Sequence, residues 1–142
     1  MATTVSIIEA EGTLRENLAR RLRLEGFDIV DTGGTGDLEQ MPNSEPADIF
    51  LLGLDGLGEK GLSLLRIIRN RWPLVPVILM SRPGQLNTSI AAMKLGAFDE
   101  ILIPFDMATL LERIEKARVG MNQNNRAAPG EQSECGGGRN RL

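Results

Sequence analysis

The chain has 142 residues, which is enough for one domain with a substantial hydrophobic core and too few for two domains of ordinary size. Its 16 basic and 19 acidic residues give a formal net charge of −3, so no nucleic-acid or membrane-surface partner is expected. No apolar run approaches the roughly 20 residues that a membrane-spanning helix needs. The sequence has no histidine, which excludes a phosphohistidine carrier, a Ser-His-Asp triad and a histidine-ligated metal site.

The cysteine content and the N-terminus both bear on the cellular compartment. Cys135 is the single cysteine, which excludes an internal disulfide and fits a reducing environment. The first residues, MATTVSII, do not have the basic region and long apolar stretch of a secretory signal. We therefore expect a cytoplasmic protein.

Short apolar runs alternate with helical patterns five times along the chain. We expect strands over residues 5–8, 27–30, 49–54, 75–80 and 100–103. Strands that alternate with helices in this way predict a parallel sheet with helices on both faces. The runs at 49–54 and 75–80 are continuously apolar, as is typical of central strands that are covered on both sides.

The helical patterns lie between these runs. We expect helices over residues 14–25, 37–41, 60–71 and 85–95, and a last helix that begins after Asp106 and ends at Gly120. Thr13 and Glu16 have the spacing of a capping box, and Gly26 is a suitable left-handed stop. Pro42 and Pro46 confine the second helix to a short segment.

The apolar spacing within the later helices predicts which side chains face the core. Trp72, Ile90 and Met93 are expected to point inward, and Asp106 is expected to cap the last helix. Residues 121–142 carry few large apolar groups and cannot offset their own ordering entropy. The expected organisation is thus one domain over residues 1–120 and a disordered polar tail over 121–142.

Several segments resemble those of response-regulator receiver domains. The stretch AMKLGAFDE at 92–100, followed by IPFD at 103–106, is similar to the end of receivers from enhancer-binding transcription activators. The stretches RRLRLEGF at 20–27 and DIFLL at 48–52 match the family as well, and the likeness covers residues 5–118. The resemblance implies a CheY-like fold, which is a flavodoxin-like, doubly wound five-stranded parallel sheet of order 2-1-3-4-5.

The positions that perform phosphorylation chemistry in that family differ here. Receivers place two acidic residues after the first strand, where this chain has Glu9 and Ala10, and their phosphoacceptor aspartate corresponds to Gly53. Phosphoryl transfer to a carboxylate needs that carboxylate as the nucleophile, and it needs Mg²⁺ held by acidic ligands. Gly53 removes the nucleophile and Ala10 removes a ligand, so we expect no cofactor and no Mg²⁺ binding.

Three further family positions lie after the fourth strand and around the fifth. The small hydroxyl residue is kept as Ser81, the lysine before the proline is replaced by Ile103, and the aromatic switch residue is replaced by Glu100. The loss of the lysine removes the cation that neutralises charge on the phosphoryl oxygens. The resemblance also implies a cis peptide bond between Ile103 and Pro104.

Three acidic residues leave two alternatives open. Glu9, Glu11 and Asp55 could form a weak cation site, with Asp55 as a surrogate phosphoacceptor that uses Glu9 and Mg²⁺. We favour the other interpretation, in which all three are solvated loop carboxylates, since Asp55 lies two residues beyond the acceptor position. A further hypothesis is a small-ligand sensor, in which a nucleotide or another anion enters the cleft beside Gly53.

The sequence therefore predicts a stand-alone pseudo-receiver that is not an enzyme. It would act in two-component phosphorelay signalling by binding a protein partner, without aspartate phosphorylation. The stand-alone character is expected because no output domain follows before Leu142. In the family the helix at 85–95, the strand at 100–103 and the last helix form the usual partner surface, and their mixed charges suit a weak symmetric homodimer.

Overall fold

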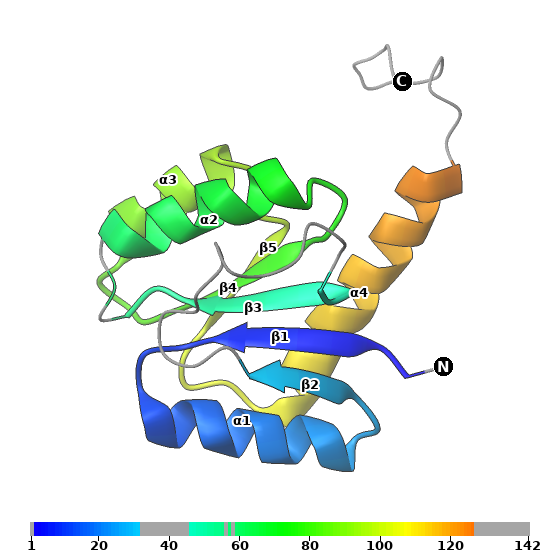
Figure 1. Cartoon of the computed structure of the whole chain (residues 1–142). Coiled ribbons are helices and arrows are strands. Elements are labelled where there is room, and N and C mark those ends of the chain that lie inside the picture. The colour runs from blue at the N-terminus through cyan, green and yellow to red at the C-terminus, as the bar shows by residue number, and fades with distance from the viewer. Residues whose placement is uncertain (1, 32–45, 56, 58, 127–142) are drawn as a thin grey trace.

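The computed structural model of this chain describes residues 2–31, 46–55, 57 and 59–126, which form five strands and four helices (Figure 1). In chain order they are β1 (Thr4–Ile8), α1 (Gly12–Leu24), β2 (Asp28–Asp31), β3 (Ile49–Gly53), α2 (Glu59–Arg71), β4 (Val77–Ser81), α3 (Leu86–Lys94), β5 (Asp99–Leu102) and α4 (Met107–Arg126). These limits lie within two residues of the expected ones, apart from the end of α4. The short helix expected at 37–41 and residues 127–142 of the expected tail lie outside the described residues.

The five strands are all parallel and follow the order β2-β1-β3-β4-β5, which confirms the CheY-like doubly wound topology. Every residue of the central strands β3 and β4 is buried, as their continuous apolar character predicts. Parallel strands end at the same edge of the sheet. Ile8 of β1 pairs with Leu52 of β3, and Gly53 of β3 pairs with Met80 of β4. This register brings the predicted site positions to one edge of the sheet.

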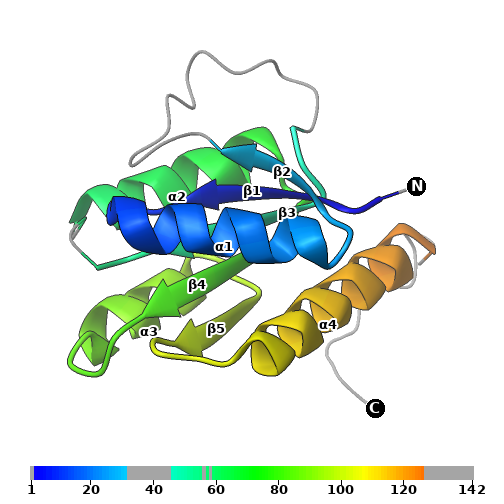
Figure 2. The same cartoon turned by 90° about the horizontal axis from the view of Figure 1, so that it is seen from below.

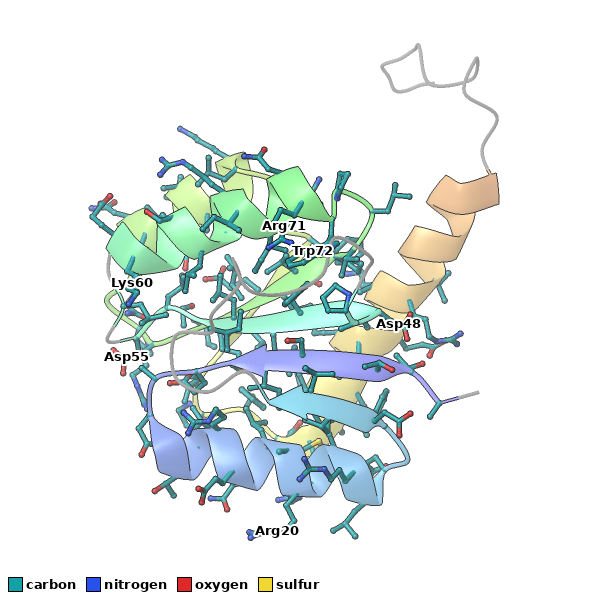
Figure 3. All side chains as sticks on the ribbon, in the orientation of Figure 1. Arg20, Asp48, Asp55, Lys60, Arg71 and Trp72 are labelled. Carbon is teal, nitrogen blue, oxygen red and sulfur yellow. The ribbon has the colours of Figure 1, made fainter. Side chains whose placement is uncertain are left out.

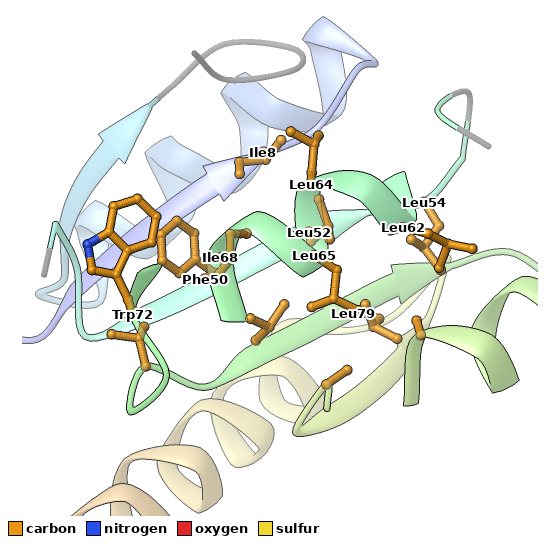
Figure 4. Close-up of a cluster of buried hydrophobic side chains, with 14 residues drawn as sticks. Ile8, Phe50, Leu52, Leu54, Leu62, Leu64, Leu65, Ile68, Trp72 and Leu79 are labelled. Carbon is orange, nitrogen blue, oxygen red and sulfur yellow. The ribbon is translucent and has the colours of Figure 1, made fainter. Parts of the chain in front are cut away.

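The helices cover both faces of the sheet, with α2 and α3 on one side and α1 and α4 on the other (Figures 1 and 2). Each side has its own core. The core beneath α2 and α3 contains Ile8, Phe50, Leu52, Leu54, Leu62, Leu64, Leu65, Ile68, Trp72, Val75, Val77, Leu79, Ala92 and Ala97 (Figure 4). The inward position expected for Trp72 is confirmed, since its side chain is 1% exposed and stacks on Phe50.

The start of α1 differs from the expected capping box. Glu11 is the N-cap, and its carboxylate accepts hydrogen bonds from the N–H groups of Thr13 at 3.2 Å and Leu14 at 2.7 Å. Thr13 already lies inside the helix, so the predicted Thr13–Glu16 box is wrong. The prediction failed because a glutamate at the N-cap can reach the same N–H groups that a threonine would satisfy. The expected left-handed Gly26 is confirmed, with φ of 99°.

The expected inward face of α3 is wrong. Ile90 and Met93 are 46% and 41% exposed, whereas Ser89 and Ala92 are buried against the sheet. A polar contact of Ser89, described below, replaces the apolar packing that the spacing of the large residues predicted.

The region around α4 contains two confirmed predictions and one error. Asp106 caps the helix by accepting the N–H of Thr109 at 2.8 Å. Hydrogen bonding with the side chain of Thr109, and then with its backbone N–H, holds the pKa of Asp106 below its usual value. The Ile103–Pro104 bond is cis. The helix nevertheless continues past Gly120 to Arg126, so the end expected at Gly120 is wrong and residues 121–126 of the expected disordered tail are helical. Gly120 packs against the ring of Phe98, whose Cε1 would lie 3.1 Å from an added Cβ. Across the described residues, no helix is long and apolar enough to cross a membrane.

Candidate functional site

The predicted site positions gather at the carboxyl edge of the sheet. Glu9 follows β1, Gly53 ends β3 and Ser81 ends β4. Asp55 lies at this same edge in Figure 3, whereas Asp48 lies at the opposite one. Open α/β sheets bind ligands outside the carboxyl ends of their strands, so this edge is the place to look for chemistry.

The side chain of Glu9 occupies the space that a residue larger than glycine would need at position 53. A Cβ atom added to Gly53 would lie 1.9 Å from Oε1 of Glu9 and 2.8 Å from its Cδ. The side chain of Glu9 is therefore not solvated as expected, since the residue is only 1% exposed. A carboxylate is thus present at the centre of the site, but it comes from β1 rather than β3.

The two oxygens of Glu9 have different surroundings. Oε2 accepts the N–H of Glu11 at 2.8 Å, while Oε1 is buried and has no hydrogen-bond partner among the described residues. The guanidinium of Arg15 donates to the main-chain oxygen of Glu9 at 2.7 Å and so covers its backbone. Burial raises the pKa of Glu9 above its ordinary value, and the N–H bond from Glu11 opposes this effect only in part.

The raised pKa predicts how stability depends on pH. A carboxyl group whose pKa is higher in the folded state stabilises the fold below its unfolded pKa of 4.5, and this contribution is lost as the pH rises through the folded pKa. We expect Glu9→Gln to raise the thermal midpoint at pH 7 by about 3 °C, because it removes a buried charge. The gain should disappear as the pH approaches 4.

Thermal unfolding followed by circular dichroism between pH 4 and pH 8 measures this difference. Glu16→Gln is the matched control, because Glu16 is exposed on α1 and should give the same midpoint as the natural chain at each pH. A midpoint that falls in Glu9→Gln at pH 7, or a gain that grows on acidification, would contradict the assignment.

The other two acidic candidates are near the site but have partners of their own. The carboxylate of Glu11 is directed into the first turn of α1, as its capping bonds show. Asp55 forms an ion pair with Arg82, with 2.8 Å between Oδ2 and Nε, and both side chains are nearly half exposed. The solvated state expected for these two residues fits their exposure, although each carboxylate has a definite contact.

The residues at this edge do not fit the Mg²⁺ ion that the resemblance implies. Mg²⁺ prefers octahedral oxygen coordination built on one or two carboxylates with room for water. Ala10 and Gly53 have no ligand atom in their side chains, and Asp55 is paired with Arg82. Among the described residues, no three acidic, cysteine or histidine side chains come together as a metal site.

Ser81 and Glu100 contact each other, whereas Ile103 lies in an apolar core. The buried hydroxyl of Ser81 donates to the carboxylate of Glu100 at 2.8 Å, and the hydroxyl of Ser89 donates to the same oxygen. Ile103 is buried in the core between the sheet and α4, together with residues such as Leu110. The position that holds a cation in the related family is thus part of an apolar core here.

Ser89 and Arg82 were not predicted as site residues from the sequence. Ser89 lies three residues before Ala92, so the two small residues share one helical face, which was the available signal. Arg82 directly follows Ser81 and gave no signal, because its contact with Asp55 joins residues 27 positions apart.

Comparison with known proteins agrees with this fold. The response regulator receiver domain family matches residues 5–115. An NtrX-like response regulator of Rickettsia typhi is 32% identical over 115 residues, which cover 80% of this chain and 24% of that protein. The transcriptional regulator NtrC of Proteus hauseri is 33% identical over 113 residues, with the same two shares. The crystal structure of NtrX from Brucella abortus superimposes with a TM-score of 0.78 at 26% identity and covers 88% of this chain and 28% of that one.

The chain belongs to the family of response regulator receiver domains, the signal-receiving units of two-component systems. It spans about a quarter of the length of the curated relatives that it matches. Receiver domains of response regulators interact with signalling partners. The family membership also agrees with the positions of Glu9, Gly53 and Ser81 at the carboxyl edge of the sheet.

Proposed function

We propose that this receiver domain works without aspartate phosphorylation, as a non-enzymatic protein-interaction module of a two-component pathway. One observation carries the proposal: the carboxylate of Glu9 lies where the side chain of an acceptor residue at position 53 would begin. Gly53 has no nucleophile to offer, and the space for a phosphoryl group bound to it is already taken.

Glu9 is a poor replacement for the missing acceptor. It is 1% exposed, so a phosphoryl donor has little access to its carboxylate as a nucleophile. A phosphoryl donor would also have to approach without the Mg²⁺ ion and the lysine that stabilise the transition state in receivers. Ile103, at the position of that lysine, contributes only to the core.

Asp55 is the second candidate, as an acceptor in a divergent but active receiver. It is accessible, with 46% of its side chain exposed, and the guanidinium of Arg82 at 2.8 Å could neutralise charge on a phosphoryl group. Against it stands the separation of Asp55 from the end of β3, because phosphoryl transfer depends on the exact placement of the nucleophile.

The small-ligand hypothesis has less support. An anion that entered beside Gly53 would meet the carboxylate of Glu9, and like charges in a buried site repel each other. The cleft therefore favours no nucleotide or phosphate as a ligand.

Incubation with acetyl phosphate and Mg²⁺, followed by intact-mass measurement, tests the proposal. We expect no adduct of about 80 Da, the mass of a phosphoryl group, under conditions that label a receiver with an intact acceptor aspartate. Asp55→Asn is the companion variant. An adduct on the natural chain that is lost in Asp55→Asn would establish the second candidate, and an adduct that persists there would point to Glu9.

The homodimer stays a proposal with one observation against it. Arg113 and Lys116 of α4 contact Asp99 of β5 within the same chain, at 3.6 and 3.8 Å. Charges that are already paired within one protomer have less to gain from a second copy. We therefore propose a different protein as the main partner.

A further inference from the structure

The helix α3 has unusually little apolar anchorage. Its buried residues are Ser89 and Ala92. By contrast, α2 buries five residues, of which four are large and apolar and one is a glycine. The N-cap residue Gln85 makes no capping bond with its side chain. The large apolar residues of α3 (Leu86, Ile90 and Met93) are 69%, 46% and 41% exposed. Ala92 and the partly buried Ala91 and Leu95 pack against the core, but the larger residues of the helix do not, so apolar burial holds α3 only weakly.

A polar cluster joins α3 to two strands. The carboxylate of Glu100 on β5 accepts the hydroxyl of Ser81 at the end of β4 and the hydroxyl of Ser89 on α3, both through Oε2. The two hydroxyl oxygens lie 3.4 Å apart, and the serines are 0% and 3% exposed. Hydrogen bonds to an ionised carboxylate are about twice as strong as those between neutral groups, and an unpaired buried hydroxyl would be costly.

Glu100 itself is held in place from two sides. β5 pairs with β4 so that Glu100 lies opposite Leu79, and the guanidinium of Arg113 on α4 donates to the main-chain oxygen of Glu100 at 3.5 Å. The carboxylate is thus presented from a fixed backbone. The cluster joins β4, β5 and α3. The two strands are also held by their pairing within the sheet, whereas α3 makes fewer contacts with the rest of the domain.

We propose that Glu100 fastens α3 to the sheet through Ser89 and so keeps the stripe of Leu86, Ile90 and Met93 turned toward solvent. Glu100 is a positioning residue for this face. The inference rests on the proposed function, in which Gly53 carries no acyl phosphate that could change the surroundings of the Ser81–Glu100 contact. The orientation of α3 is then a constant property of the chain rather than a response to phosphorylation.

Hydrogen exchange of the full chain, measured by mass spectrometry, tests this assignment. We expect Glu100→Ala to accelerate exchange of the α3 amides roughly tenfold, while the amides of α2 stay unchanged. Ser89→Ala should act on α3 in the same way. Glu100→Gln keeps the shape but loses the charge, and its effect should be intermediate. Ser63→Ala on the exposed face of α2 and Glu115→Gln, a side chain 58% exposed, are the matched controls and should change neither helix.

Two results would overturn the proposal. The first is exchange in α3 that stays within about twofold of the natural chain in both Glu100→Ala and Ser89→Ala. The second is an equal acceleration in α2 and α3, which would mean a general loss of stability. If Glu100→Ala fails to fold, Ser89→Ala and Glu100→Gln still decide the outcome. A phosphoryl adduct on the natural chain would refute the proposed function by a separate measurement and would leave the exchange result intact.

Discussion

Replacing Gly53 with aspartate is expected to destabilise the protein by about 2–3 kcal/mol, although aspartate is the residue that active receivers have there. The new Cβ would lie 1.9 Å from Oε1 of Glu9, so the side chain of Glu9 must leave its position. Its bond with the N–H of Glu11 is then at risk, and a second carboxylate enters a buried site beside that of Glu9. Steric and electrostatic effects therefore act in the same direction.

The double variant Glu9→Asp with Gly53→Asp tests the cause. Aspartate is one methylene shorter, so it leaves room at position 53 and should recover about 1 kcal/mol relative to the sum of the two single changes. Urea unfolding followed by the fluorescence of Trp72, the single tryptophan, measures all of these variants.

Gly12→Asp is the control for the Gly53 series. Gly12 begins α1, and the nearest atom to an added Cβ there is Nη2 of Arg15 at 3.9 Å, an ordinary contact. An acidic residue in the first turn of a helix is also favourable, so this variant should be near neutral. A Gly53→Asp protein as stable as the natural chain, or strict additivity with Glu9→Asp, would show that the two positions do not compete for space.

Trp72→Ala is expected to have the largest effect on stability, a loss of about 4 kcal/mol. Trp72 follows α2, is 1% exposed, and stacks on Phe50 of β3 with 5.5 Å between ring centroids (Figure 4). The guanidinium carbon of Arg71 lies 4.8 Å from the centre of the Trp72 ring. Removing the indole leaves a cavity between helix and sheet, which neighbouring side chains can fill only in part. Because native domains are stable by only about 5–15 kcal/mol, much of the total would be lost.

Urea unfolding followed by circular dichroism suits this variant, since it has no tryptophan fluorescence. Leu74→Ala is the matched control, because Leu74 is two residues away and 54% exposed, and its loss should cost less than about 0.5 kcal/mol. Trp72→Phe should lie between the two. A loss in Trp72→Ala no greater than in Leu74→Ala would contradict the central role of this contact.

Both kinds of result bear on function. The Gly53 variants test whether Glu9 fills the space beside position 53. The Trp72 variants measure how much the packing of Trp72 on Phe50 of β3 contributes to the stability of the domain. Under the proposed function, in which Glu9 fills the space beside Gly53 and Glu100 fixes α3, the partner surface of this receiver would not depend on a phosphate. Its activity would then follow the concentrations of the chain and of its partner.

The amino-acid sequence by itself determined the fold and placed a glycine at position 53, which the resemblance matches to the acceptor position. Alternating apolar runs and helical patterns are local signals, so the five parallel strands and their connecting helices could be predicted within two residues at most ends. The absence of a carboxylate at Gly53 is likewise visible without coordinates, because it concerns the identity of one residue in a matched segment. The cis bond before Pro104 followed from the same resemblance.

The tertiary structure alone decided where the polar side chains lie. Glu9 reaches the space at Gly53 because β1 and β3 are neighbours in the sheet, although the two residues are far apart in the chain. Ser89 faces inward, against the pattern of large apolar residues on α3, because the carboxylate of Glu100 on β5 is within reach. The periodicity of a helix shows only which of its faces is more apolar. A buried hydrogen bond to a charged group needs a partner from another element, and the local sequence does not contain that partner.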